Sequence, residues 1–107
     1  RMSFEGVPDE QLVEEYRRAA PSNRSAIANA LFSRHYERVG RWCYRVLGDR
    51  DAAADLAQDV FVKALKHLES FKGSSKFSTW LYVIVRNESF TRRQRPAADQ
   101  LDDAVAA

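Results

Sequence analysis

The segment KFSTWLYVIVRNESFTRR, from Lys76 to Arg93, places aromatic side chains within one or two helical turns of several arginines. An outer stripe at the helical spacing i, i+4, i+7 and i+11 consists of Tyr82, Arg86, Ser89 and Arg93. Guanidinium groups bind phosphates through forked hydrogen bonds, and aromatic faces stack on unpaired bases. The spacing therefore suits a surface that holds one nucleic-acid strand. The alternative is a core helix whose basic end complements the helix dipole.

The loop before this helix, KGSSKFST, adds lysines, hydroxyl groups and backbone amides beside Phe77. A loop of this chemistry can hold a base that has been taken out of a duplex. The inward side of the helix is predicted to consist of Trp80, Leu81, Ile84 and Val85. On that position alone, Trp80 is a core residue rather than a platform for a base.

A second candidate surface lies on the helix expected from about residue 52 to 71. Its inward side is predicted to consist of Leu56, Val60, Ala64, Leu68 and Phe71, with Phe61 and Leu65 at the edge. The opposite side gathers Asp55, Asp59, Val62, Lys66 and Glu69, with Gln58 flanking it. Acidic residues around a small apolar patch suit a protein partner with a basic surface and an apolar centre. The alternative is an ordinary solvated face on which Val62 is a scattered apolar residue.

These surfaces need a scaffold, and the pattern predicts an all-α fold, a compact bundle of about four helices. The expected helices cover residues 9–20, 24–47 and 52–71, followed by one that Ser78 or Thr79 caps and that runs to about 93. Residues 21–23 separate the first two helices, Gly48 ends the second and Pro96 stops the last. The chain has 107 residues, which is the size of one domain.

Arginines also recur at helical spacing in the second expected helix, at Arg34, Arg38, Arg41 and Arg45. They either extend a phosphate-binding track or keep the domain hydrated, and the sequence slightly favours hydration. His35 falls on the apolar side of this helix, where a partly buried and hydrogen-bonded histidine is expected rather than a metal ligand.

The composition bounds the classes of function. The net charge of +2 conceals uneven segments, because residues 72–96 carry six basic side chains and one acidic one. The single cysteine, Cys43, excludes an intramolecular disulfide and a cysteine-rich zinc site. No nucleophile–base pair, glycine-rich phosphate loop or carboxylate pair stands out. The sequence therefore predicts no enzyme, no cofactor and no metal. Without a long apolar run or a signal peptide, a cytoplasmic protein without membrane insertion is expected.

Two motifs in order, DLAQDVFVKALKHLESF (55–71) and KFSTWLYVIVRN (76–87), closely resemble region 2 of bacterial sigma factors of the extracytoplasmic-function (ECF) group. The resemblance covers about residues 9–96. It implies that the third helix docks on the clamp helices of the largest subunit of core RNA polymerase. It also implies that the fourth helix and its loop recognise and melt the minus-10 promoter element by capturing the single-stranded non-template strand.

By position, the resemblance implies polymerase contacts at Asp55, Gln58, Asp59, Val62 and Lys66. It implies promoter contacts at Lys72, Ser74, Lys76, Phe77, Ser78, Thr79, Trp80, Tyr82, Arg86, Asn87, Phe90, Thr91, Arg92, Arg93 and Arg95. The asparagine at position 87 matches one that captures a base in the family, although its place on the helical wheel also allows a structural role. The chain departs from the group at Val83, where a basic residue is frequent, and lacks the usual Gly-Asp turn near Pro21.

The resemblance divides the chain into residues 1–8, a tag remnant and flexible N-terminus; 9–96, the region 2 domain; and 97–107, the start of a linker. A second domain that reads the minus-35 element is expected to be absent. Members of this group are usually held inactive by an anti-sigma factor, so such a partner is expected. Two other hypotheses stay open: a stand-alone helical regulator that binds duplex DNA without polymerase, and a helical protein-interaction module.

Overall fold

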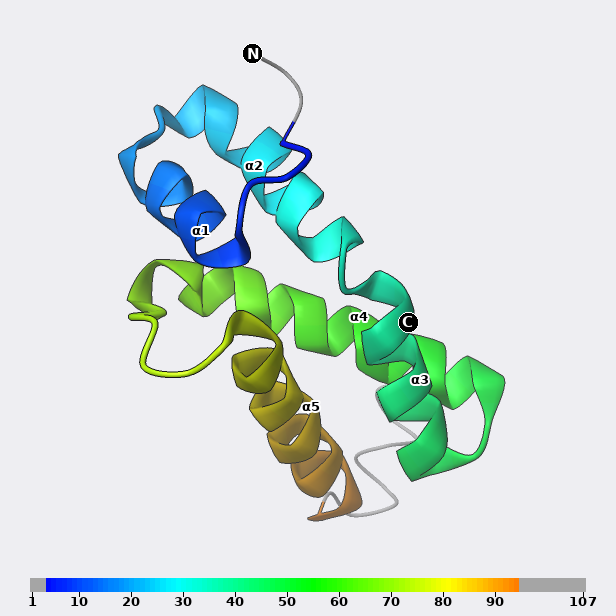
Figure 1. Ribbon diagram of the computed structural model, residues 1–107. Helices are drawn as coiled ribbons and strands as arrows, with labels where there is room; N and C mark the ends of the chain where they lie inside the picture. Colours follow the sequence, from blue (N-terminus) through cyan, green and yellow to red (C-terminus); the bar gives the residue numbers. More distant parts are fainter. Residues whose placement is uncertain (1–3, 95–107) are drawn as a thin grey trace.

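The computed structural model describes residues 4–94, and these residues form five α-helices and one 3-10 turn (Figure 1). The elements are α1 (Asp9–Arg18), α2 (Pro21–Ser33), α3 (Tyr36–Leu47), α4 (Arg50–His67), the 3-10 turn η1 (Leu68–Ser70) and α5 (Phe77–Gln94). The predicted all-α fold is confirmed. The predicted tail, residues 97–107, lies outside the described residues.

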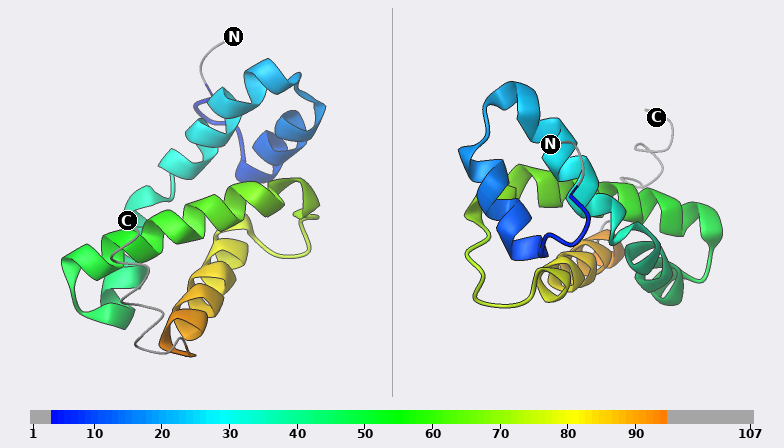
Figure 2. Two further views of the ribbon diagram at one scale, coloured as in Figure 1. Left: turned by 180° about the vertical axis from the view of Figure 1, so that it is seen from behind. Right: turned by 45° about the horizontal axis from the view of Figure 1, so that its top comes forward.

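The helices form two groups on either side of α4 (Figure 2). The helices α1 and α2 pair as a hairpin, and α1 also contacts η1 at the end of α4. On the other side α3, α4 and α5 pack against one another in all three combinations. The two candidate surfaces therefore belong to one three-helix unit, because α4 carries one and α5 carries the other.

The single helix expected over residues 24–47 is wrong, because the chain turns at Arg34 and His35 between α2 and α3. His35 leaves the helical conformation, with φ −113° and ψ 3°, and its ring Nε2 lies 2.8 Å from Asp9 Oδ2. Arg34 donates to the carbonyl oxygens of Phe4 and Val7. Contacts with the segment before α1 thus stabilise the break, and they are invisible in local periodicity. His35 is buried and hydrogen-bonded, as predicted.

Three helix starts also differ from the sequence pattern. The helix α2 begins at Pro21, since a proline in the first turn gives up no intrahelical hydrogen bond. The helix α4 begins at Arg50, and the Asp49 carboxylate caps it by accepting a hydrogen bond from the Ala52 amide at 2.8 Å. Capping of α5 by Ser78 or Thr79 is wrong. That helix starts at Phe77, whose amide donates to the Glu10 carboxylate of α1 at 3.2 Å.

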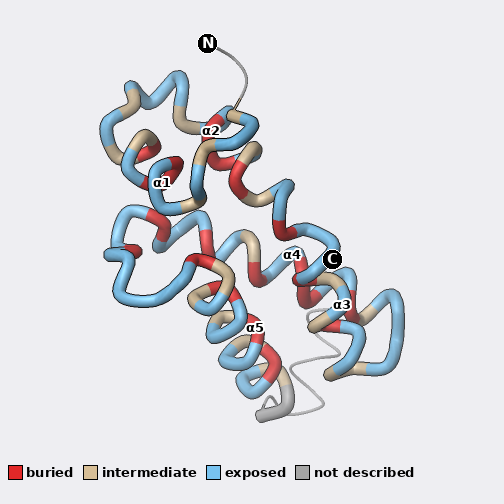
Figure 3. Tube along the Cα trace, in the orientation of Figure 1, coloured by how far each residue is buried: buried red, intermediate tan, exposed pale blue. Residues whose placement is uncertain are grey.

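The core lies along α4, as the buried segments in Figure 3 show. All five residues predicted for the inward side of α4 and its extension are buried: Leu56, Val60, Ala64, Leu68 and Phe71. From α5, Leu81 and Val85 are buried, and Trp80 and Ile84 pack against the core while partly exposed. The predicted inward side of α5 is therefore confirmed. Burying aliphatic and aromatic side chains of this size supplies most of the stabilisation of such a domain.

Two arginines hold the end of α4 against the α1–α2 hairpin. Arg17 donates from Nε to the carbonyl oxygen of Glu69 at 3.0 Å, and Arg24 pairs with the Glu69 carboxylate. The Arg24 guanidinium also lies 4.9 Å from the centre of the Tyr16 ring. These contacts fix η1, from which the loop before α5 departs.

We predict that glycine-to-alanine substitutions at the two glycines of α3 and its end change stability in opposite directions. Gly48 adopts φ +71°, so Gly48→Ala is expected to lower the free energy of unfolding by about 1–2 kcal/mol. Gly40 is helical and an added Cβ meets nothing within 4 Å, so Gly40→Ala is expected to raise it by up to about 1 kcal/mol. Urea denaturation followed by circular dichroism measures both. Equal losses for the two variants would contradict this account of the helix end.

Candidate nucleic-acid interface

The helices α3 and α5 lie side by side and run in the same direction. The rings of His35 and Phe77, at the two helix starts, have centroids 5.4 Å apart. Further along, Trp42 of α3 meets Tyr82 of α5 edge to face at 5.1 Å. Trp42, Tyr82, Arg45 and Arg86 then line a shallow groove together with Val46, Val85 and Ser89. The aromatic–arginine pattern of α5 therefore continues onto α3.

The predicted outer stripe of α5 is interrupted. Tyr82 is 46% exposed and Arg86 is exposed, whereas Ser89 is only 5% exposed. The expectation of a continuous stripe is wrong at Ser89, because α3 packs beside that position. Its hydroxyl donates instead to the Arg86 carbonyl oxygen at 2.9 Å. The side chain of Arg93 and the whole of Arg95 lie outside the described residues.

The loop between η1 and α5 exposes most of its predicted contact residues. Lys72, Ser74 and Lys76 are exposed, and Gly73 with φ +78° makes the turn that presents them. At the start of the helix Thr79 is exposed and Ser78 is partly so. The backbone and side chains of this loop thus remain accessible to a ligand.

The side chain of Phe77, which is predicted to contact DNA, has no exposed surface in this structure. Its ring packs against the rings of Phe32, His35, Phe71 and Trp80, at centroid distances between 5.4 and 6.4 Å. A helical wheel of α5 alone cannot show three of these neighbours, since Phe32, His35 and Phe71 come from other parts of the chain. Phe77 therefore anchors α5, and the accessible groups beside it form the candidate surface.

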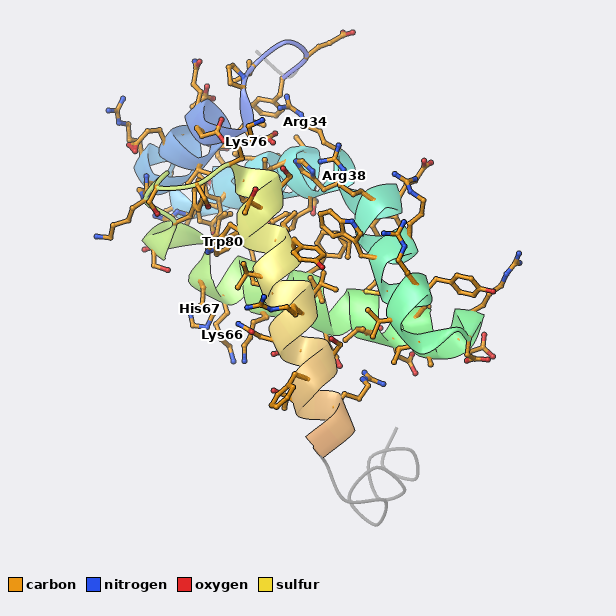
Figure 4. All side chains as sticks on the ribbon, turned by 60° about the horizontal axis from the view of Figure 1, so that its bottom comes forward. Arg34, Arg38, Lys66, His67, Lys76 and Trp80 are labelled. Atoms are coloured by element: carbon orange, nitrogen blue, oxygen red, sulfur yellow. The ribbon has the colours of Figure 1, made fainter. Side chains whose placement is uncertain are left out.

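A second groove lies on the opposite side of α5, between this helix and α4. Trp80, Asn87 and His67 line it together with Lys63, Ser70, Val83, Ile84 and Glu88. Figure 4 shows Trp80 and His67 on this side of α5 and Lys76 at its beginning. Asn87 is exposed here, so its amide can contact a ligand. The remaining predicted residues near the end of α5, Phe90 and Thr91, are exposed.

The structure brings the residues predicted for protein docking onto one exposed side of α4. Asp55, Gln58, Asp59, Val62 and Lys66 are all exposed, with Val62 at 58%. The sequence missed two apolar neighbours of this side, Leu65 and Tyr36, which are 47% and 67% exposed. Gln58 and Val62 line a groove with them and with Phe61, so the apolar centre is larger than expected.

One ion pair connects the two candidate surfaces. Arg92 of α5 donates to Asp59 of α4 at 2.8 Å, although the sequence assigns the first to DNA and the second to a protein partner. Both side chains remain partly exposed, so this pair contributes at most about 1 kcal/mol to stability. A partner that contacted either side chain would therefore compete with an existing ion pair.

The described residues offer little for catalysis. Burial raises the pKa of the Cys43 thiol to about 11, and the nearby Arg92 charge opposes this only in part. A thiol in that state is a poor nucleophile at neutral pH. Within residues 4–94 no three His, Cys, Asp or Glu side chains gather in a way that could hold a metal. Over the same range no helix is long and apolar enough to cross a membrane.

Comparison with known proteins defines the class. Residues 31–98, well over half of the chain, match the Sigma-70 region 2 family. The chain belongs to this family. The match begins within α2 and covers both motifs, the loop between them and α5.

Individual relatives agree with this assignment. The chain is similar to the ECF RNA polymerase sigma factor SigW of Bacillus subtilis, with 38% identity over 71 residues, 66% of this chain and 38% of that protein. It is also similar to the ECF RNA polymerase sigma-E factor of Escherichia coli, with 32% identity over 102 residues, 92% of this chain and 51% of that protein. The chain thus spans about half or less of these relatives.

Among solved structures, the fold resembles an engineered region 2 of sigmaE determined by NMR in complex with GTAAAA. The TM-score is 0.68 at 33% sequence identity, and the match covers 82% of this chain and 87% of the other. Both the arrangement of helices and the sequence therefore relate the two domains.

We predict that two phenylalanines of α5, both assigned to DNA by sequence, behave differently when replaced by alanine. Phe77→Ala is expected to lower the free energy of unfolding by about 3–5 kcal/mol, because it empties a fully buried site. Phe90 is 62% exposed, and Phe90→Ala is expected to change the free energy of unfolding by about 0.5 kcal/mol or less. Thermal and urea denaturation compare the two variants. A stable Phe77→Ala protein would show that the anchor is dispensable.

Proposed function

We propose that this chain is the promoter-opening domain of an ECF sigma factor. It docks on core RNA polymerase through α4 and captures the single-stranded non-template strand of the minus-10 element with α5 and the preceding loop. The observation that carries the proposal is the exposed set of Tyr82, Arg86, Asn87 and loop lysines on a fold similar to a sigmaE domain in complex with GTAAAA.

The chemistry of strand capture follows from the groups on the surface. Exposed Tyr82 offers a face for an unpaired base, while Arg86 and the loop residues Lys72 and Lys76 supply positive charge for phosphates. The amide of Asn87 can both donate to and accept from a base edge beside Trp80. The domain then melts DNA by binding the open strand more tightly than the duplex, without a chemical step. No catalytic role is proposed.

Docking follows from the exposed side of α4. Asp55 and Gln58 supply polar contacts, and Val62 with its apolar neighbours supplies the centre that excludes water. We propose the clamp helices of the largest polymerase subunit as the partner, as the resemblance implies. An anti-sigma factor that covers either surface would block initiation, and the site of action would be the cytoplasm.

The proposed domain division keeps residues 9–96 as the functional unit. Residues 97–107 are proposed to begin a linker toward a second domain that reads the minus-35 element. Such a domain is consistent with the length of the relatives, of which this chain spans about half or less.

We predict that Gln58→Arg weakens capture of core RNA polymerase at least tenfold, because it places a bulky positive charge beside the apolar centre of the docking side. The matched control is Gln11→Arg, which makes the same change at an exposed position of α1. Pull-down of purified core polymerase by the tagged chain, with quantified bound polymerase, measures both. Equal capture by the two variants would overturn docking through α4, and no capture by the wild-type chain would overturn the proposed function.

A further inference from the structure

Three arginines lie on the surface where α3 and α5 run side by side: Arg38 and Arg45 on α3, and Arg86 on α5. All three are exposed. Among residues 4–92, whose side chains the structure describes, none of the three forms an ion pair with a carboxylate. Arg38 contacts only the ring nitrogen Nδ1 of His35, at 3.5 Å. Their positive charge is thus available to a ligand.

The three arginines share one face because of the register between the helices. On α3, Arg38, Trp42 and Arg45 follow one another at i, i+4 and i+7. The ring of Trp42, between the two arginines in this row, meets the ring of Tyr82 of α5. Arg45 lines the same groove as Arg86. Figure 4 shows Arg38 on the α3 side of α5, opposite the side of Trp80 and His67. Tyr82 therefore lies between the arginines of the two helices.

Acidic side chains that would repel a polyanion lie elsewhere in the described part of these helices. Glu37 of α3 lines the grooves that face α4, and it does not line the groove between α3 and α5; Arg45 borders both sides. Glu88 of α5 pairs with Lys63 across the groove on the other side, at 3.4 Å. The α3–α5 face thus combines exposed guanidinium groups with a half-exposed aromatic ring, which is the chemistry of single-strand binding surfaces.

We propose that Arg38 and Arg45 extend the strand-binding surface from α5 onto α3, where they bind phosphates of the same single DNA strand that contacts Tyr82. The inference rests on the proposed function and adds a binding site to it. A single strand is favoured over duplex because the ring between the arginines can stack only on an unpaired base. Arg38 and Arg45 lie about 10 Å apart along the helix axis, so they contact different phosphates. The sequence left a phosphate-binding track and hydration both open for these arginines, and the proposal assigns Arg38 and Arg45 to the track.

The test is a salt titration of binding by the full chain, with two substitutions and a matched control. Arg38→Gln/Arg45→Gln removes the proposed contacts. The control, Arg18→Gln/Arg50→Gln, removes two exposed arginines that lie on α1 and α4. Fluorescence anisotropy measures affinity for single-stranded GTAAAA with a thymidine extension at each end, and for the corresponding duplex. Circular dichroism establishes that all variants are folded.

The variant Arg38→Gln/Arg45→Gln is expected to bind the extended single strand about tenfold more weakly at about 50 mM salt, while the control Arg18→Gln/Arg50→Gln binds about as tightly as the wild type. The slope of log K against log salt should become shallower by about 1.4, or about 0.7 for each lost phosphate contact. If wild type binds and Tyr82→Ala weakens binding, but Arg38→Gln/Arg45→Gln binds as tightly as the control variant, the α3 site is overturned and the proposed function stands. If Arg38→Gln/Arg45→Gln loses affinity only for duplex, the strand assignment is overturned. If wild type binds no single strand, both proposals fall.

Discussion

Burial of Phe77 is the constraint on which the arrangement of the candidate surfaces depends. Its ring is enclosed by Phe32 of α2, His35 before α3 and Phe71 before the loop, while its amide is bound by Glu10 of α1. Residues from α1, α2, the turn before α3 and the end of η1 thus meet the first residue of α5. The loop and α5 are proposed to bind bases and phosphates, so their first residues need a fixed position. A small misplacement of the binding groups would cost affinity.

The far part of α5 is held more weakly, by partly exposed ion pairs to α4 such as that between Arg92 and Asp59. Core packing therefore fixes the position of the start of α5, whereas the end of α5 is held by contacts that a partner could replace. This division suits the proposed role. The proposed docking and strand binding would change the surroundings of α4 and α5 without disturbing the buried residues that position them.

Much of the fold followed from local patterns, because the inward sides of α4 and α5 repeat apolar residues at helical spacing. The family resemblance also followed from two motifs in order. The break at His35, the cap from Glu10 and the burial of Phe77 and Ser89 did not follow, because each depends on residues distant in the sequence. The alignment of α3 beside α5 could not be predicted for the same reason. Periodicity marked the arginines of α3 as a stripe, but only the contact between Trp42 and Tyr82 shows what that stripe faces.

The most direct test of the account is a titration of the ¹⁵N-labelled chain with single-stranded GTAAAA, followed by amide chemical shifts in NMR spectra. The account predicts shifts concentrated in the loop at 72–76, along the exposed side of α5 and on the side of α3 that faces it. Amides of α1 and α2 away from Phe77 should stay unchanged. Shifts centred on α1 and α2, or none at millimolar DNA, would contradict the claim that this surface captures an unpaired strand.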